Sequence, residues 1–297
     1  ELDIIAPLQF DGQSLLQYQH YYFAVFPSKG GRPFSAEQDE HWEQLGNLLG
    51  QIHQTGAGQA FRHRPQLNIA ADLQQAMVLA FGGLHGSAVA VEPATGNILG
   101  MVSLPSFDPN LFVNGISHDD YRSLMDDPTR PLFNRNVLGG GPPGSTIKPL
   151  VALAGVDSGL RTPESRVFST GEFFIPGQRR GYRDAHGGAG WTDLRKSISQ
   201  SVNTYYYRLA LDLGIAQFDD YMEHYGFGEP TGVDLRGEIG GILPSPQAKL
   251  KARKERWYPG DTVNVAIGQG DWKVTPLQLV RATAGIADGQ MRRPHLV

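Results

Sequence analysis

The sequence predicts an α+β fold, and three observations carry that prediction. Small and β-branched residues alternate over residues 87–103, around a turn at residues 93–96, which is the pattern of a β-hairpin. Several separate stretches have the apolar spacing of helices. Strands and helices do not alternate in the regular order of a parallel α/β sheet, and no internal repeat is present. We therefore expect a sheet flanked by helices.

The composition is that of a globular, turn-rich chain. Its 297 residues are 40% hydrophobic, 10% aromatic and 19% charged, which excludes a coiled coil and a disordered chain. The net charge of −4 offers no general attraction to nucleic acid, so we predict no nucleic-acid partner. The absence of cysteine excludes disulfides, thiolate nucleophiles and cysteine-ligated zinc.

The sequence pattern changes near residue 70, which predicts that the chain has two separate parts. In residues 1–70, the aromatic run 19–26 predicts a strand, and residues 42–53 have the spacing of a helix. One strand and one helix do not close a core, so this segment needs a partner. Residues 71–297 are predicted to form the main domain.

The elements of the main domain follow in chain order. A short helix is predicted over residues 73–81, ahead of the hairpin. The breaker cluster at residues 139–144 leads abruptly into a helix over residues 145–156. Further helices are predicted over residues 194–213, 218–225 and 277–287.

One short motif combines a nucleophile with a base. Ser145 and Lys148 are three residues apart, so a first helical turn would place both side chains on one face. A serine hydroxyl is a weak nucleophile without a base, and a desolvated lysine at a helix N-terminus can act as that base. Free backbone N–H groups at the same helix end would face an incoming carbonyl oxygen. The alternative is an N-cap serine beside a surface lysine, because about one such motif is expected by chance.

A second motif and a long stretch of agreement point to a family. Ser201-Val202-Asn203 lies in the run predicted to be helical, and the two motifs resemble two of the three signatures of the penicillin-recognising serine acyltransferases. Residues 103–117, the Tyr-Arg-Asp triplet at 182–184 and residues 257–279 extend the likeness. From about residue 72 to residue 297 the chain resembles the class B penicillin-binding protein 2 family of rod-shaped Gram-negative bacteria.

The resemblance implies a fold and a reaction. The fold is that of the penicillin-binding transpeptidases and serine β-lactamases, and the reaction is the D,D-transpeptidation of peptidoglycan during cell elongation. In this reaction Ser145 attacks the D-Ala-D-Ala amide and Lys148 accepts its proton. Ser201 relays the proton to the leaving amine, and Asn203 binds the acyl side chain of the substrate. β-Lactams would acylate the same serine.

The resemblance also implies binding residues and partners. Substrate-binding positions would be Gly144, Gly268, Gln269, Gly270, Trp272 and Thr275, although a purely structural turn explains residues 268–275 equally well. The implied partners are peptidoglycan stem peptides, β-lactams and, for the parent protein, a glycosyltransferase of the elongation machinery. The implied location is the periplasmic face of the inner membrane, with the anchor absent from this chain.

No cofactor or metal is predicted. Some members of the family hold a zinc ion near the Tyr-Arg-Asp triplet. In this sequence only Asp184 matches a ligand position of that site, because Ser169, Ala189 and Val202 occupy the other three.

The sequence departs from the family pattern at two places. The third signature, Lys-Ser/Thr-Gly, is absent; its strand supplies an oxyanion donor worth about 3 kcal/mol, so we expect a truncated chain with impaired catalysis. Residues 1–68 resemble instead a fragment of a stress-response kinase of the aminoglycoside-phosphotransferase type, without its nucleotide-binding lysine and catalytic loop. We expect a chimeric chain joined near residues 68–72, the alternative being a divergent pedestal piece.

Two other functions stay open at this point. A serine β-lactamase would need a deacylating carboxylate, and no Glu-x-x-Leu-Asn sequence follows Asn203. A catalytically inactive chimeric or truncated fragment would merely retain the signatures.

Overall fold

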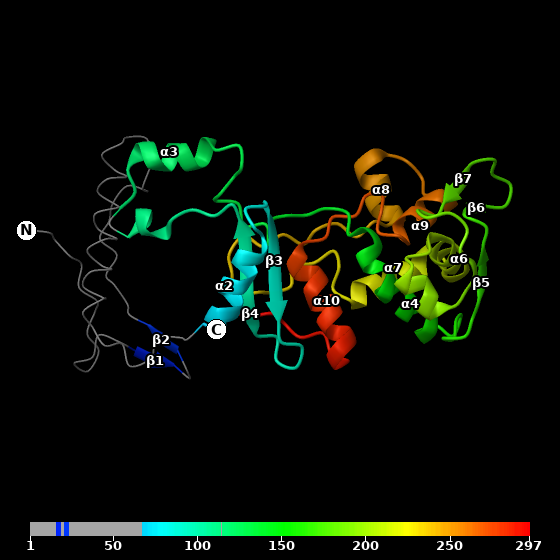
Figure 1. Cartoon of the computed structure of the whole chain (residues 1–297), viewed down its shortest axis with the longest axis horizontal. Helices are drawn as coiled ribbons and strands as arrows, with labels where there is room; N and C mark the ends of the chain where they lie inside the picture. Colours follow the sequence, from blue (N-terminus) through cyan, green and yellow to red (C-terminus); the bar gives the residue numbers. More distant parts are fainter. Residues whose placement is uncertain (1–15, 19–20, 24–66, 114) are drawn as a thin grey trace, which may run out of the picture. The chain divides into compact units, whose positions relative to one another are not determined.

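A computed structural model describes residues 16–18, 21–23, 67–113 and 115–297 of the chain (Figure 1). The chain divides into two compact units, one made of Glu1–Gly58 and Asn110–His118, the other of Gln59–Pro109 and Asp119–Val297. The predicted boundary near residue 70 stays a prediction.

In the first unit, strands β1 (Leu16–Tyr18) and β2 (Tyr21–Phe23) form an antiparallel pair. The strand predicted over residues 19–26 therefore coincides in part with β2. The helix predicted over residues 42–53 lies outside the described residues, as does most of the kinase-like segment.

The other elements come in runs of short strands and runs of helices. The strands are β3 (Gly86–Val91), β4 (Ile98–Leu104), β5 (Val167–Ser169), β6 (Glu172–Phe174), β7 (Gly181–Arg183) and β8 (Gly190–Thr192). The helical elements are α2 (Ala71–Ala80), η1 (Pro109–Phe112), α3 (His118–Asp126), η2 (Gly144–Ile147), α4 (Lys148–Asp157), α5 (Leu194–Ser199), α6 (Asn203–Leu213), α7 (Ile215–His224), α8 (Pro246–Arg253), α9 (Pro259–Val265) and α10 (Pro276–Asp288). Within the described residues, no helix has the length and apolar content to cross a membrane.

The predicted hairpin and the helix before it are confirmed. Strands β3 and β4 pair antiparallel, with α2 packed against β4 and α10 against β3 (Figure 1). The Gln74 amide of α2 bonds both the N–H and the C=O of Met101, each at 2.8 Å, and so satisfies backbone groups of β4 that β3 does not reach. A small core around Ile98 and Leu277 joins this hairpin to α10.

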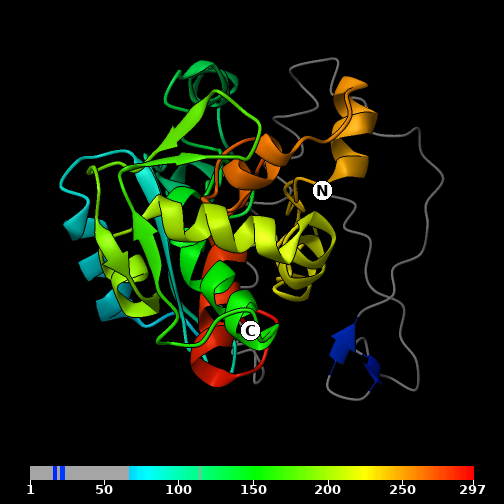
Figure 2. The same cartoon turned by 90° about the vertical axis from the view of Figure 1, so that its right-hand side faces the viewer.

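A second group of elements surrounds helix α6, which crosses the middle of Figure 2 in yellow-green. Helix α6 contacts α4, α5, α7, α9 and strands β5 to β7. Tyr205, Tyr206 and Leu209 on this helix are fully buried. Leu209 packs directly on Gly155 of α4, where any side chain would collide with it. Because α4 and α6 pack closely, the residues at the N-terminal ends of these two helices also lie close together.

The helices predicted in the C-terminal half are confirmed, with one correction. The run 194–213 is two helices, because the chain turns at Ser201, whose φ of 53° is in the left-handed region. The predicted helix 145–156 likewise begins with the 3-10 turn η2 before α4. Strands β5 to β8 were not predicted, since three-residue strands carry too little pattern to be recognised.

Shortening Leu209 should destabilise the contact between α4 and α6. Leu209→Ala removes a fully buried side chain and leaves a cavity beside Gly155, so we expect the free energy of unfolding to fall by about 2–5 kcal/mol. Chemical denaturation measures this. The control is Leu250→Ala on α8, where the side chain is 55% exposed and the change should stay within about 0.5 kcal/mol. Equal effects of the two substitutions would contradict the role of Leu209.

Candidate active site

The amine of Lys148 lies inside the protein among three oxygen atoms. Lys148 is the first residue of α4 and is 1% exposed. Its Nζ donates to the backbone oxygen of Ser201 at 2.8 Å, to Ser201 Oγ at 2.8 Å and to Asn203 Oδ1 at 2.6 Å. The Tyr206 ring lies 5.3 Å from Nζ. This burial excludes the alternative in which Lys148 is a surface residue.

Ser145, in contrast, is exposed at the surface. It lies on the 3-10 turn η2, and its Oγ accepts a hydrogen bond of 3.0 Å from Ser201 Oγ. Ser201 Oγ therefore contacts both the Ser145 hydroxyl and the Lys148 amine. The left-handed backbone of Ser201 and its place between α5 and α6 bring this hydroxyl to that position.

The predicted direct contact between Ser145 and Lys148 is corrected by this arrangement. Among the described residues, no hydrogen bond joins these two side chains; Ser201 Oγ connects them. The physical reason is that the oxygens of Ser201 and Asn203 already take up the three donors of the Lys148 amine. The Lys148 amine is therefore connected to the Ser145 hydroxyl through the Ser201 hydroxyl.

Asn203 holds Lys148 on its other side. While Asn203 Oδ1 accepts from Lys148, Asn203 Nδ2 donates to the backbone oxygen of Arg183 at 3.1 Å. These two partners fix which end of the amide faces the lysine.

Burial lowers the pKa of Lys148 to about 8, and the nearby Asp184 carboxylate opposes this shift by favouring the charged amine. Three oxygen partners match the three donors of an ammonium group, so the charged form is well accommodated. With a pKa near 8, both the charged and the neutral amine are populated at mildly alkaline pH. The neutral amine is the form that can accept a proton.

The turn at residues 268–270 packs against the backbone just before Ser145. The N–H of Gly144 donates to the Gly268 oxygen at 2.9 Å, and the Gln269 side chain lies close to Gly144. Gly144 and Gly268 have φ values of 58° and 70°, which glycine adopts without strain. The structure thus brings Gly144, Gly268 and Gln269 next to the nucleophile, with Gly270 exposed one residue further.

Trp272 and Thr275 have packing roles instead of the predicted contact with substrate. Trp272 is 1% exposed, packs edge-on against Phe218 and Phe227, and donates from its indole nitrogen to the Val265 oxygen. Thr275 is fully buried and caps α10. The sequence pattern could not separate these core residues from their exposed neighbours, because both belong to the same family stretch.

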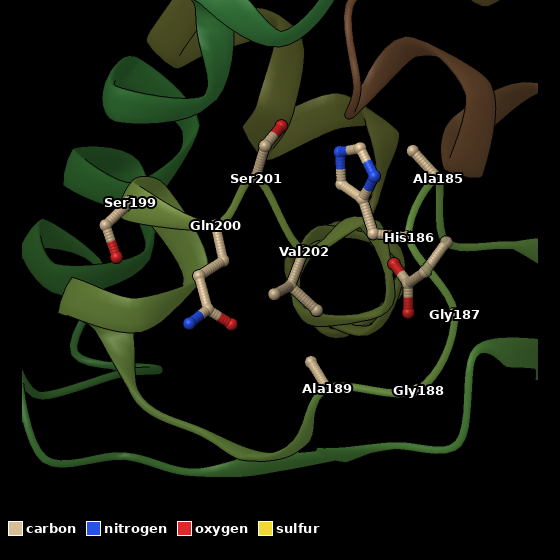
Figure 3. Close-up of a pocket in the computed structure, with 10 residues that line it drawn as sticks. Ala185, His186, Gly187, Gly188, Ala189, Ser199, Gln200, Ser201 and Val202 are labelled. Atoms are coloured by element: carbon tan, nitrogen blue, oxygen red, sulfur yellow. The ribbon is translucent and has the colours of Figure 1, made fainter.

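Ser201 also lines a pocket of about 430 Å³ (Figure 3). One side of this pocket is the loop of residues 184–189, and the other is the segment of residues 199–202 that leads into α6. In Figure 3 the Ser201 hydroxyl points away from Gln200, Val202 and Ala189, so the pocket borders the segment that carries Ser201.

The predicted absence of a metal can be tested on the donor atoms around Asp184. Its Oδ2 accepts from Ser169 Oγ and Thr204 Oγ1, both at 2.6 Å, and its Oδ1 accepts from the Thr204 N–H at 2.8 Å. Ala189 and Val202 have no ligand atoms in their side chains. Among the described residues, no three or more His, Cys, Asp or Glu side chains form a group that could hold a metal ion. These residues do not fit a zinc ion.

No sequence motif predicted a role for Thr204, Tyr206 or the Arg183 carbonyl. These groups contact Asp184, Lys148 and Asn203 respectively. The Tyr-Arg-Asp triplet was a signal for part of this set. A backbone carbonyl carries no side-chain signature, so the contact between the Arg183 carbonyl and Asn203 could be recognised only in the folded structure.

A family model and known relatives match this chain. Residues 86–297 match the model of the penicillin binding protein transpeptidase domain. The "Peptidoglycan D,D-transpeptidase MrdA" of Acinetobacter baumannii is 44% identical over 233 residues, which are 78% of this chain and 35% of that protein. The chain thus spans about a third of the length of this curated relative.

Solved structures agree with the family model. The chain is similar to PBP2 of Pseudomonas aeruginosa in complex with WCK 5153, with 46% identity, a TM-score of 0.76 and coverage of 78% of this chain and 51% of that one. It is also similar to PBP2 of Helicobacter pylori in its complex with MreC, with 34% identity, a TM-score of 0.74 and coverage of 78% and 43%. Both likenesses confirm the predicted fold class.

Substituting Gly268 should disturb the turn that carries Ser145. A Cβ at this position would collide with the oxygen of Gly144 and lie 2.6 Å from its nitrogen. Gly268→Ala should therefore cost more than the roughly 1–2 kcal/mol of placing alanine in a left-handed conformation.

Gly270→Ala is the matched control, because Gly270 also has a positive φ, of 86°, but a Cβ there would have its nearest neighbouring atom 3.8 Å away. Urea unfolding should give a clearly larger loss of stability for Gly268→Ala than for Gly270→Ala. Equal losses would show that backbone strain alone, and not the contact with Gly144, accounts for the effect.

Proposed function

Because the chain belongs to the penicillin-binding protein transpeptidase family, we propose that it is the acyl-transfer part of a peptidoglycan D,D-transpeptidase. The observation that carries this proposal is the continuous contact from Ser145 Oγ through Ser201 Oγ to Lys148 Nζ. It links an exposed nucleophile to a buried base. The name of the Acinetobacter relative, a peptidoglycan D,D-transpeptidase, supports the same reaction.

In the acylation step, Ser145 Oγ attacks the carbonyl carbon of the D-Ala-D-Ala amide. The Ser145 proton passes to Ser201 Oγ, while the Ser201 proton passes to the neutral Lys148 amine. Hydroxyl groups rotate freely and can both donate and accept, so both hydrogen bonds can point toward the lysine. The N-terminal turn before α4 lies beside the oxygen that becomes negative, where backbone N–H groups favour negative charge.

The same groups return the proton when the amide bond breaks. The Lys148 ammonium gives a proton back through Ser201 to the nitrogen of the departing D-alanine, which leaves an ester between Ser145 and the acyl group. The amine of a second stem peptide then attacks the acyl carbon of this ester, and the bond from that carbon to Ser145 Oγ breaks. A proton of the attacking amine passes through the relay to Ser145 Oγ and restores its hydroxyl. Each step only moves one proton along the relay, and no other reactant is required.

Asn203 is proposed to bind the acyl side of the substrate, and Gly144, Gly268, Gln269 and Gly270 to guide its approach beside Ser145. A β-lactam carries an amide carbonyl in a strained ring, so the same attack would produce a stable ester with Ser145. The family's name as penicillin-binding proteins supports this inhibitor class.

The proposed substrates are peptidoglycan stem peptides, and the proposed place is the periplasmic face of the bacterial inner membrane. The Helicobacter relative forms a complex with MreC, so a partner from the elongation machinery is proposed for this protein, including a glycosyltransferase in the parent protein. We keep the kinase-like origin of residues 1–68 and the chimeric junction as predictions.

Penicillin labelling is the direct test. We expect a fluorescent penicillin to form an adduct with the 297-residue chain that survives denaturing gel electrophoresis, and we expect no adduct with Ser145→Ala.

The outcome also separates the alternatives. A label that disappears within minutes by hydrolysis would favour a serine β-lactamase. No label on either protein after prolonged incubation would favour the inactive fragment and contradict the proposal.

The rate of labelling should rise with pH. Because the neutral Lys148 amine accepts the proton and its pKa is about 8, we expect the acylation rate to increase through a midpoint near pH 8 and then to level off. Burial raises the pKa of the adjacent Tyr206 phenol, so that group stays neutral over this range. Lys148→Ala should lower the rate by about 10²–10⁴. A midpoint near pH 10, as for a lysine in water, would contradict the buried base.

A further inference from the structure

Helix α6 begins without a capping side chain of its own. The residue before it is Val202, which has no hydrogen-bonding side chain, so the first N–H groups of α6 need other partners. Asp184, at the end of β7, provides one: its Oδ1 accepts from the Thr204 N–H at 2.8 Å. A carboxylate at this end of a helix is also favoured by the helix dipole.

The same carboxylate is fixed by two buried hydroxyl groups. Asp184 Oδ2 accepts from Ser169 Oγ and from Thr204 Oγ1, each at 2.6 Å. Ser169 is 2% exposed and Thr204 is 4% exposed, so water does not compete freely for these bonds. Hydrogen bonds to a charged acceptor are stronger than those between neutral groups.

The neighbouring residue completes the connection to the relay. The Arg183 oxygen accepts from Asn203 Nδ2 at 3.1 Å and from the Tyr207 hydroxyl at 3.3 Å. With Nδ2 engaged in this way, Asn203 Oδ1 faces Lys148. Two consecutive residues, Arg183 and Asp184, therefore hold the first turn of α6 against the lysine.

We propose that Asp184 is a positioning residue, which caps α6 from a distant strand by hydrogen bonds and thereby holds Ser201 and Asn203 in place around Lys148. The donor atoms around Asp184 do not fit a metal ion, so the hydrogen bonds from Ser169 and Thr204 hold its carboxylate in place. The consequence for acylation rests on the proposed function, whereas the consequence for the start of α6 does not.

Two substitutions of Asp184 separate hydrogen bonding from size. Asp184→Ala removes all three hydrogen bonds. Asp184→Asn keeps an oxygen for the Thr204 N–H, and its amide nitrogen can donate to the Thr204 hydroxyl, because a hydroxyl also accepts. It loses the bond with Ser169 Oγ, which already accepts from the N–H groups of Gly171 and Ala189. The matched control is Ser245→Ala, which removes the side-chain cap of α8, a helix that carries no residue of the relay.

Amide hydrogen exchange measured by NMR tests the helix start without any need for activity. We expect the Thr204 N–H to exchange about tenfold faster in Asp184→Ala, since a bond to a charged acceptor is lost. Asp184→Asn should lie close to the wild type, and Ser245→Ala should leave the Thr204 rate unchanged. An unchanged rate in Asp184→Ala, or equal rates in the alanine and asparagine variants, would overturn the proposal.

Penicillin acylation tests the consequence for the relay. We expect the acylation rate to fall about tenfold or more in Asp184→Ala and much less in Asp184→Asn, with little change in Ser245→Ala at a similar loss of stability. A chelator should not change the wild-type rate. A rate that falls with the chelator and returns with added Zn²⁺ would overturn the hydrogen-bonded role. If the wild type is not acylated at all, the proposed function fails while the exchange result still decides the role of Asp184.

Discussion

The burial of the Lys148 amine is the constraint on which the rest of this site depends. A lone ammonium inside a protein is strongly unfavourable, so its surroundings have to supply a hydrogen-bond acceptor for each of its protons. Here all three acceptors come from residues 201–203, at the start of α6. The lysine itself begins α4. The packing of α4 on α6, with Gly155 against Leu209, is therefore a condition for the chemistry as well as for stability.

The proposed base and the proposed nucleophile need different surroundings, and the fold separates them. Lys148 requires burial, which lowers its pKa to about 8, whereas Ser145 has to be reached by a substrate. A direct contact would force both groups into the same environment. A single hydroxyl, that of Ser201, bridges the buried and the exposed side, and its left-handed backbone conformation is the local strain that this position requires.

The sequence was sufficient for the parts of the fold and site that depend on local pattern. The hairpin of residues 87–103 and the helices after it follow from periodicity, and Ser145, Lys148, Ser201 and Asn203 follow from two motifs. The 3-10 turn, the break at Ser201 and the pairing of β5 with β8 could not be predicted, because long-range packing determines them. For the same reason the motif stretch did not reveal that Trp272 belongs to the core.

The cap of α6 shows how a site can be fixed from outside its own motifs. Ser-x-Asn supplies the groups that contact Lys148, but the residue between them, Val202, cannot cap the helix that these groups begin. A carboxylate directly after β7 supplies the missing acceptor, and hydroxyls of buried side chains orient it. Each such bond to a charged group contributes about 1.5–3 kcal/mol, which is comparable to the loss of one helix cap. Three of them on one carboxylate are enough to hold a helix N-terminus without a metal ion, provided that the donors stay buried, as Ser169 and Thr204 are.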